Sequence, residues 1–286
     1  MSLYQGFTAE QLAIEYSPSS CISDINEFIN QYIDQSAQAK LLASNNHSIR
    51  ANLSYGDKPT QTIDLFMPTT SARRKLHVYI HGGYWQELSK EESSFAATNF
   101  QQYGAHFAVI NYTLAPNASL TDIVTECRAA IAWLRDNAET FGYDKNEIYL
   151  SGSSAGAHLA AMCVLDTTLP IKGICAVSGV YDLTPIPFTY INEPLQLSPQ
   201  ETSENSPLNH ISNWPARCHC IIAYGANETS EFKRQSNVFY EQLKLHGLDA
   251  ITHEIAQRNH FDVILDLADN NSWLFQQAAK QMQLID

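Results

Sequence analysis

Residues 152–156 read Gly-Ser-Ser-Ala-Gly, so that Ser154 stands at the centre of a Gly-x-Ser-x-Gly pattern. A β-branched and aromatic run at 147–150 precedes it, and a helix-forming stretch at 155–165 follows. This context is typical of a nucleophile elbow, a strained turn that exposes the serine hydroxyl. The helix that begins there directs free N–H groups at a forming oxyanion. A plain small-residue turn is the alternative, and we predict that Ser154 is a nucleophile.

A serine nucleophile needs a base at neutral pH. In this arrangement the chain order is serine, acid, histidine. The sequence contains ten histidines, and His260 follows the last predicted strand, just before the closing helix. We therefore predict His260 as the base. His246 at a helix end, His253 within a strand and His158 beneath the elbow are interpreted as structural.

The acid should follow the strand predicted at 219–224, and Glu228 is the first carboxylate there. Its predicted role is to hold the His260 imidazole in the productive tautomer. A solvated loop glutamate would have the same sequence position. Glu231 and Asp262 remain alternative acids, although Glu231 also suits the first turn of the next helix.

An acyl-transfer site also needs backbone donors for the oxyanion. Ala155 follows the nucleophile and supplies one N–H group. Gly82, Gly83 and Tyr84 follow the strand predicted at 76–81, and glycines let the backbone approach a substrate closely. We predict that these residues complete the oxyanion hole.

Aromatic residues near these strand ends suggest a pocket for a planar aryl substrate. The candidates are Tyr84, Trp85, Phe188 and Tyr190. Aromatic residues at strand ends are also common in ordinary cores, so this prediction depends on where the chain places them.

Strands and helices alternate along the chain, which predicts an α/β protein with a mostly parallel sheet and helices on both faces. The predicted strands are 52–55, 62–67, 76–81, 106–111, 147–150, 173–178, 219–224 and 250–255. The predicted helices are 8–16, 23–42, 92–103, 120–141, 155–165, 230–246 and 261–283. We expect one domain, 1–286, with a helical N-terminal segment at 8–43 and a cap-like, Pro-rich insertion at 181–215.

The 17 basic and 30 acidic residues give a formal charge of −13, and there is no basic run. This argues against nucleic-acid and anionic-membrane partners. We see neither a signal peptide nor a membrane span. The six cysteines are scattered, which favours reduced core residues of a cytoplasmic protein. Cys218-His219-Cys220 lacks a second ligand pair at zinc spacing, so we expect neither metal nor cofactor.

Several segments resemble the kynurenine formamidases (arylformamidases), a family of α/β-hydrolases. His81-Gly82-Gly83-Tyr84-Trp85 and residues 151–162 look like that family's signatures. Further similar segments are 16–19, 55–57, 177–186, 205–207 and 231–236. The family usually carries aspartate at the acid position, where this chain has Glu228.

The resemblance implies an α/β-hydrolase fold and hydrolysis of N-formyl-kynurenine to kynurenine and formate, without metal or cofactor. The residues alone indicate a serine hydrolase of a small-molecule acyl ester or amide. A broad carboxylesterase for short-chain esters is the first alternative, and a non-catalytic binding protein on a hydrolase fold is the second. A homodimer is left open by the sequence.

Overall fold

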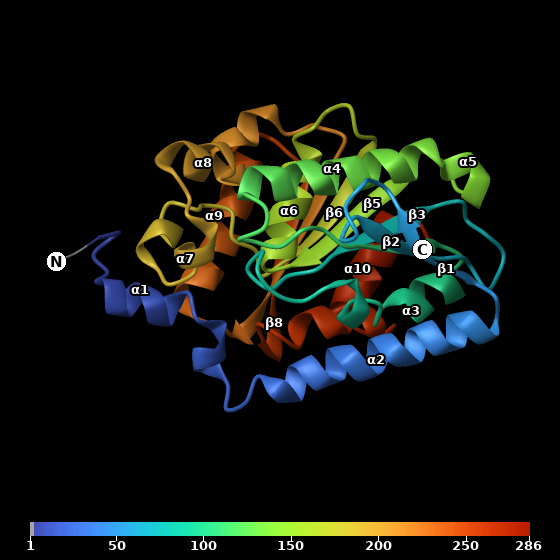
Figure 1. The fold of residues 1–286 in the computed structure, drawn as a ribbon, viewed down its shortest axis with the longest axis horizontal. Coiled ribbons are helices and arrows are strands. Elements are labelled where there is room, and N and C mark those ends of the chain that lie inside the picture. Colours follow the sequence, from blue (N-terminus) through green and yellow to red (C-terminus); the bar gives the residue numbers. More distant parts are fainter. Residues whose placement is uncertain (1–2) are drawn as a thin grey trace.

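A computed structural model describes residues 3–286, which contain one eight-stranded sheet (Figure 1). Its strands are β1 (Ile49–Ser54), β2 (Thr62–Phe66), β3 (Leu76–Ile80), β4 (His106–Ile110), β5 (Ile148–Ser153), β6 (Ile171–Val177), β7 (His219–Asn227) and β8 (Ala250–Asn259). They lie in the order β1-β2-β4-β3-β5-β6-β7-β8. The pairs β1–β2 and β2–β4 are antiparallel, and all later pairs in this order are parallel. The predicted mostly parallel sheet is confirmed.

Helices cover both faces of this sheet. The α-helices are α1 (Ala9–Glu15), α2 (Asn26–Asn45), α3 (Ala97–Gln102), α4 (Leu120–Asp136), α5 (Ala138–Phe141), α6 (Ala155–Val164), α7 (Asn192–Leu195), α8 (Pro199–Glu204), α9 (Ser230–Leu245) and α10 (Trp273–Gln281). Short 3₁₀ helices are η1 (Pro18–Cys21), η2 (Lys90–Glu92), η3 (Ile186–Phe188), η4 (Pro207–Asn213) and η5 (Val263–Ala268). Figure 1 shows α4 and α6 on one side of the sheet, and α2, α3 and α10 on the other. Residues 3–286 hold no helix that combines the length and hydrophobicity of a membrane span.

Alternating side chains along the central strands divide the core into two layers. On β3, Val78 and Ile80 belong to the core layer that contains α4 and α6, whereas Tyr79 belongs to the layer with α3 and α10. Every residue of β3, β4 and β5 is buried. A strand covered on both faces is apolar on both, which explains the near-continuous apolar run at 76–80.

Three predicted helices differ from the structure by more than three residues at one end. The helix expected at 92–103 begins only at Ala97, because Ser89 and Glu92 form a capping box around η2 instead. The helix expected at 120–141 is divided at Asn137, whose side-chain amide donates to the Trp133 carbonyl.

The closing helix expected at 261–283 is wrong in its first half, because α10 begins at Trp273. Residues 263–268 form η5 instead. The polar turn between them is closed by Asp269, which accepts from the Asn271 N–H group, and Ser272 then caps α10 by accepting from Phe275. Polar side chains that bond the nearby backbone compete with a continuous helix.

The Pro-rich stretch lies between β6 and β7 and contains η3, α7, α8 and η4. Proline cannot donate to a strand ladder, and here it begins short helices at positions 199 and 207, where its missing N–H group costs nothing. This stretch places Tyr190 and Ile191 near the carboxyl end of the parallel strands.

The turn from β5 into α6 approaches β3 more closely than side chains would allow. A Cβ atom on Gly156 would lie 2.0 Å from the Ile80 carbonyl oxygen, and one on Gly152 would lie 2.3 Å from the Gly156 backbone. Both obstacles are backbone atoms, which no rotamer change can move. Glycine is therefore required at both positions for α6 to pack against the end of β3.

We expect Gly156→Ala to lower the free energy of unfolding by roughly 1–3 kcal/mol, because the backbone must shift to accept the methyl group. Chemical unfolding followed by circular dichroism measures this change. Gly142→Ala is the comparison: its added Cβ atom meets nothing within 4 Å, so its loss of stability reflects only the strain of a φ of +88° and should be smaller than that of Gly156→Ala. Equal stability of the Gly156→Ala variant and the parent would contradict the close-approach explanation.

Candidate active site

Ser154 occupies the sharp turn between β5 and α6. Its φ of 57° and ψ of −120° lie outside the favoured backbone regions for a residue with a side chain. The Ser154 N–H group donates to the Val177 carbonyl at 2.8 Å, which holds the strained turn against β6. The residue is 7% exposed and lines a cavity. This geometry presents the hydroxyl at the carboxyl end of the parallel strands, as a nucleophile elbow does.

His260 and Glu228 form a buried pair beside this turn. His260 follows β8, Glu228 follows β7, and Nδ1 of the histidine lies 2.9 Å from Oε2 of the glutamate. A carboxylate at Nδ1 keeps the proton on that nitrogen and leaves Nε2 free to act as a base. Because His260 and Ser154 both line the cavity, the predicted base and the predicted nucleophile share one space.

Two further donors hold the Glu228 carboxylate. Its Oε1 accepts from the Ser178 hydroxyl and from the Gly225 N–H group, each at 2.6 Å. The side chain is 0% exposed, so these bonds replace the water that the carboxylate loses. No sequence pattern predicts the contact of Ser178 with Glu228, because only the fold brings the end of β6 next to the end of β7.

The two alternative acids have other partners. Glu231 accepts from the Tyr16 hydroxyl at 2.8 Å and pairs with Arg234 at 2.7 Å. Asp262 accepts from the Asn259 N–H group at 2.6 Å and closes the turn that carries His260. Within residues 3–286, Glu228 is the acid that contacts the His260 ring.

His158 lies beneath the elbow, on α6. Its Nδ1 accepts from the Trp85 indole N–H group at 3.2 Å, and its Nε2 lies 2.6 Å from the Asn205 carbonyl. Burial lowers the pKa of His158 to about 4, so the ring is neutral at pH 7. It thereby ties the segment after β3 to the stretch between β6 and β7.

The loop after β3 brings its backbone to the nucleophile. A Cβ atom on Gly82 would lie 2.7 Å from the Ser153 carbonyl oxygen, and Gly83 has a φ of +92°. Across the described chain, the N–H groups of Gly83, Tyr84 and Ala155 have no backbone acceptor. Free N–H groups on both sides of a nucleophile are what an oxyanion hole requires.

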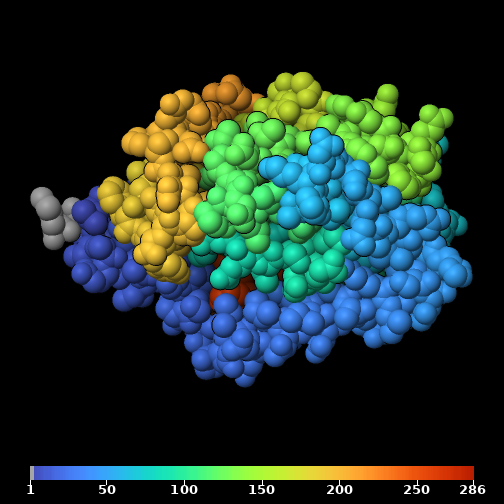
Figure 2. Space-filling view, in the orientation of Figure 1, coloured from blue at the N-terminus to red at the C-terminus, as the bar shows by residue number. Residues whose placement is uncertain are grey.

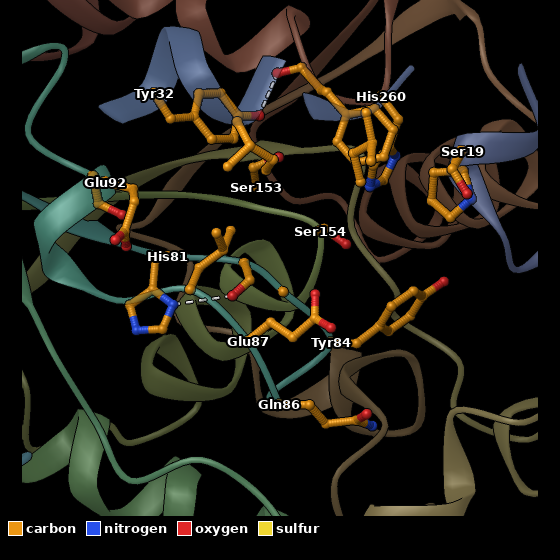
Figure 3. A pocket seen from close by; sticks show the side chains of 18 of the residues that line it. Ser19, Tyr32, His81, Tyr84, Gln86, Glu87, Glu92, Ser153, Ser154 and His260 are labelled. Carbon is orange, nitrogen blue, oxygen red and sulfur yellow. Dashed lines mark hydrogen bonds between the residues drawn. The ribbon is translucent and has the colours of Figure 1, made fainter. Parts of the chain in front are cut away.

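The cavity has a volume of about 270 Å³. Figure 2 shows a small red area, from the C-terminal part of the chain, in a hollow between blue N-terminal atoms below and teal to green atoms above. Figure 3 shows Ser154, His260 and Tyr84 around this space. The cavity is therefore bounded by segments far apart in sequence.

Two of the four aromatic pocket candidates line the cavity, namely Tyr84 and Tyr190. The other two do not. Trp85 is 0% exposed and points under the elbow toward His158, whereas Phe188 is 42% exposed and lies outside the wall. The positive φ of both Tyr84 and Trp85 reverses the chain and sends their rings to different sides, which the sequence does not reveal.

The N-terminal segment supplies a wall that the sequence did not predict. Pro18, Ser19, Ile25, Ile29 and Tyr32 all line the cavity. The segment is fixed there because the Tyr84 hydroxyl donates to the Tyr16 carbonyl at 2.7 Å. Burial raises the pKa of Tyr84 well above its usual range, so this hydroxyl remains a donor. Residues 16–19 are among the sequence segments that resemble the kynurenine formamidases. Their position at the cavity wall is set by the fold.

Metal or cofactor ligands would have to come from clusters of His, Cys, Asp or Glu. Among residues 3–286 no group of three or more such side chains is arranged to hold a metal ion. Cys218 and Cys220 are both buried free thiols, so that their motif contributes to the core.

Comparison with known proteins gives both the family and the fold. Residues 63–243 match the sequence profile of the BD-FAE family. The kynurenine formamidase of Danio rerio is 32% identical, with 95% of each chain covered. That of Salmo salar is also 32% identical, with 99% of each chain covered. A solved esterase from Pyrobaculum calidifontis superposes with a TM-score of 0.71 at 19% identity, covering 92% of this chain and 94% of its own.

These likenesses confirm the predicted α/β-hydrolase fold and the prediction of an enzyme. The chain is a hydrolase that belongs to the kynurenine formamidase family and to the BD-FAE family.

Proposed function

We propose that this chain hydrolyses an aryl formamide, N-formyl-kynurenine, to kynurenine and formate through a covalent formyl-enzyme. Ser154 is the nucleophile, His260 the general base and Glu228 the acid that orients it. The observation that carries the proposal is the 2.9 Å contact between Glu228 and His260 at the wall of the cavity that contains Ser154. Full-length similarity to kynurenine formamidases supports the substrate.

In the first step, Nε2 of His260 takes the Ser154 proton while the serine oxygen attacks the formyl carbon. The N–H groups of Gly83, Tyr84 and Ala155 stabilise the negative oxygen of the tetrahedral intermediate, and Gly82 gives this loop its close approach. The C–N bond then breaks, and His260 protonates the leaving aryl amine. The formyl group remains as an ester on Ser154.

In the second step, a water molecule takes the place of the amine. His260 accepts a proton from the water as its oxygen attacks the formyl ester, and the same N–H groups bind the second oxyanion. The ester bond breaks, the serine oxygen recovers its proton from His260, and formic acid leaves and loses its own proton to water to give formate. Glu228 stabilises the imidazolium in both steps.

We further propose that residues 1–286 act as one domain in which 181–215 serve as a cap over the site. The single sheet and the placement of Tyr190 and Ile191 on the cavity wall support this arrangement. Five buried free thiols support a reducing, cytoplasmic environment.

Ser154→Ala should lower kcat at least about a thousandfold, because no other hydroxyl takes its place as nucleophile. Steady-state kinetics measure the loss, and a fluorophosphonate probe should label the parent at Ser154 but not the variant. Circular dichroism melting serves as the folding control. A well-folded Ser154→Ala variant with parent-like turnover would exclude the serine mechanism.

Glu228→Gln should lower kcat by about a hundredfold to ten-thousandfold with a small change in KM, because the amide no longer fixes the His260 tautomer. Asp262→Asn is the matched control: it lies next to the histidine loop, and its remaining oxygen can still accept from Asn259. It should retain most of the activity. The reverse order of effects would assign the acid role to Asp262.

Short-chain ester hydrolysis is the alternative function, because the same groups would cleave an ester and Ile25, Ile29 and Phe95 could contact an acyl chain. Comparison of kcat/KM for N-formyl-kynurenine and for p-nitrophenyl acetate and butyrate separates the two. We expect the formamide to be preferred. Preference for butyrate by an order of magnitude or more would assign the chain to the esterases.

A further inference from the structure

The wall of the active-site cavity carries negative but no fixed positive charge. Glu87 and Glu92 both line it, and no Lys or Arg does so among the described residues. Neither histidine on the wall leaves an uncompensated positive charge there. Burial lowers the pKa of His81 to about 4, and His260 is already paired with Glu228.

Glu87 is aimed at the cavity by a tight turn. The Gly83 carbonyl accepts from the N–H groups of Gln86 and Glu87, each at 2.9 Å. The Gln86 side-chain amide donates to the Ile191 carbonyl at 2.7 Å, which ties the turn to the stretch after β6. In Figure 3 the Glu87 carboxylate points into the space between Ser154 and Tyr84.

Glu92 lies across the cavity, near Tyr32 in Figure 3. Its Oε2 accepts from the Ser89 hydroxyl at 2.8 Å and from the Ser89 N–H group at 3.0 Å. Its Oε1 has no hydrogen-bond partner in the described chain. The side chain is therefore held by one oxygen while the other is free to bind a ligand.

The nearby lysines are committed to other carboxylates. Lys90 lies 2.8 Å from Asp64 and 2.7 Å from Glu91, and Lys40 lies 3.0 Å from Asp64. These ion pairs keep both ammonium groups away from Glu92. Among residues 3–286 the two glutamates on the wall thus have no cationic partner, and a substrate could provide one.

We propose that Glu87 and Glu92 form a subsite for a positively charged group on the leaving-amine side of the substrate. The inference rests on the proposed function, because a formyl group is a single carbon and the remainder of a formamide must then occupy the cavity. An ammonium-bearing aryl amine fits this subsite. A substrate whose only charge is a carboxylate is repelled by the wall and by the protein's net charge of −13.

The test uses a series of aryl formamides. All of them carry the same ketone attached to the aryl ring, and they differ only in the charge of the side chain on that ketone. The four side chains carry an ammonium group, an ammonium and a carboxylate, no charge, or a carboxylate alone. We expect kcat/KM to fall in that order, with roughly tenfold between the cationic and neutral compounds. An equal or higher kcat/KM for the anionic compound would overturn the proposal.

Charge-removing variants then assign the effect to residues. Glu87→Gln and Glu92→Gln should each lower the cation-to-neutral ratio of kcat/KM by about threefold to tenfold, and should raise the anion-to-neutral ratio. Glu193→Gln is the matched control, because Glu193 is an exposed residue of α7 outside the cavity wall. It should leave both ratios unchanged. If all three variants change the ratios equally, the effect is long-range and there is no subsite.

A parallel series of aryl acetates separates this inference from the proposed function. The phenyl ring carries a trimethylammoniomethyl, methyl or carboxymethyl group, so that a small acyl group is again combined with a charged or neutral leaving group. Cleavage of the acetates in the expected charge order, without cleavage of formamides, would reject the formamide substrate and retain the subsite. Formamide turnover without any dependence on charge would retain the formamide substrate and reject the subsite.

Discussion

The site depends on a close approach of two backbone segments that only glycine permits. Gly156 lies against the Ile80 and His81 carbonyl groups, and Gly82 lies against the Ser153 carbonyl. These contacts bring the N-terminus of α6 to the end of β3. The proposed nucleophile on one segment and the proposed oxyanion donors on the other consequently share one space. Backbone lies on both sides of the contact, so a larger residue there would displace the proposed catalytic groups themselves.

A second constraint is the burial of the acid. The Glu228 side chain is one methylene longer than that of aspartate, and its buried carboxylate is held by three contacts rather than by exposure to water. Ser178 and the Gly225 N–H group bind one oxygen, while His260 binds the other. These three contacts offset part of the cost of removing a carboxylate from water. The ends of three neighbouring strands, β6, β7 and β8, each provide one part of this arrangement.

The N-terminal segment is coupled to the same region. Glu15 accepts from the Ser230 hydroxyl at 2.8 Å and from the Glu231 N–H group at 3.0 Å, so it caps the helix that follows Glu228. The Tyr16 ring is 0% exposed and packs near Phe232, which in turn contacts the His260 ring. Residues 8–43 thus both wall the cavity and support the elements that carry the acid and the base.

The sequence by itself determined the elements that local chemistry controls. Apolar, β-branched and aromatic runs predicted the strands, and the glycine spacing around Ser154 predicted the elbow, because these signals act within a few residues. The chain order of His260 and Glu228 placed both after strands that proved to be neighbours. The sequence still left three candidates for the acid. Glu228 and His260 are more than thirty positions apart, and the sequence does not show whether residues so far apart in the chain lie close in space.

Only the tertiary structure decided which side chains meet. It paired Glu228 with His260, and gave Glu231 to Arg234 and Asp262 to the histidine turn. It also turned Trp85 away from the cavity that Tyr84 lines, and brought Glu87 and Glu92 to face one space. The physical reason is that sheet order and positive-φ turns set the direction of each side chain, and neither can be read from residue type. Local sequence determines which chemical groups are present, and long-range packing determines which of these groups come into contact.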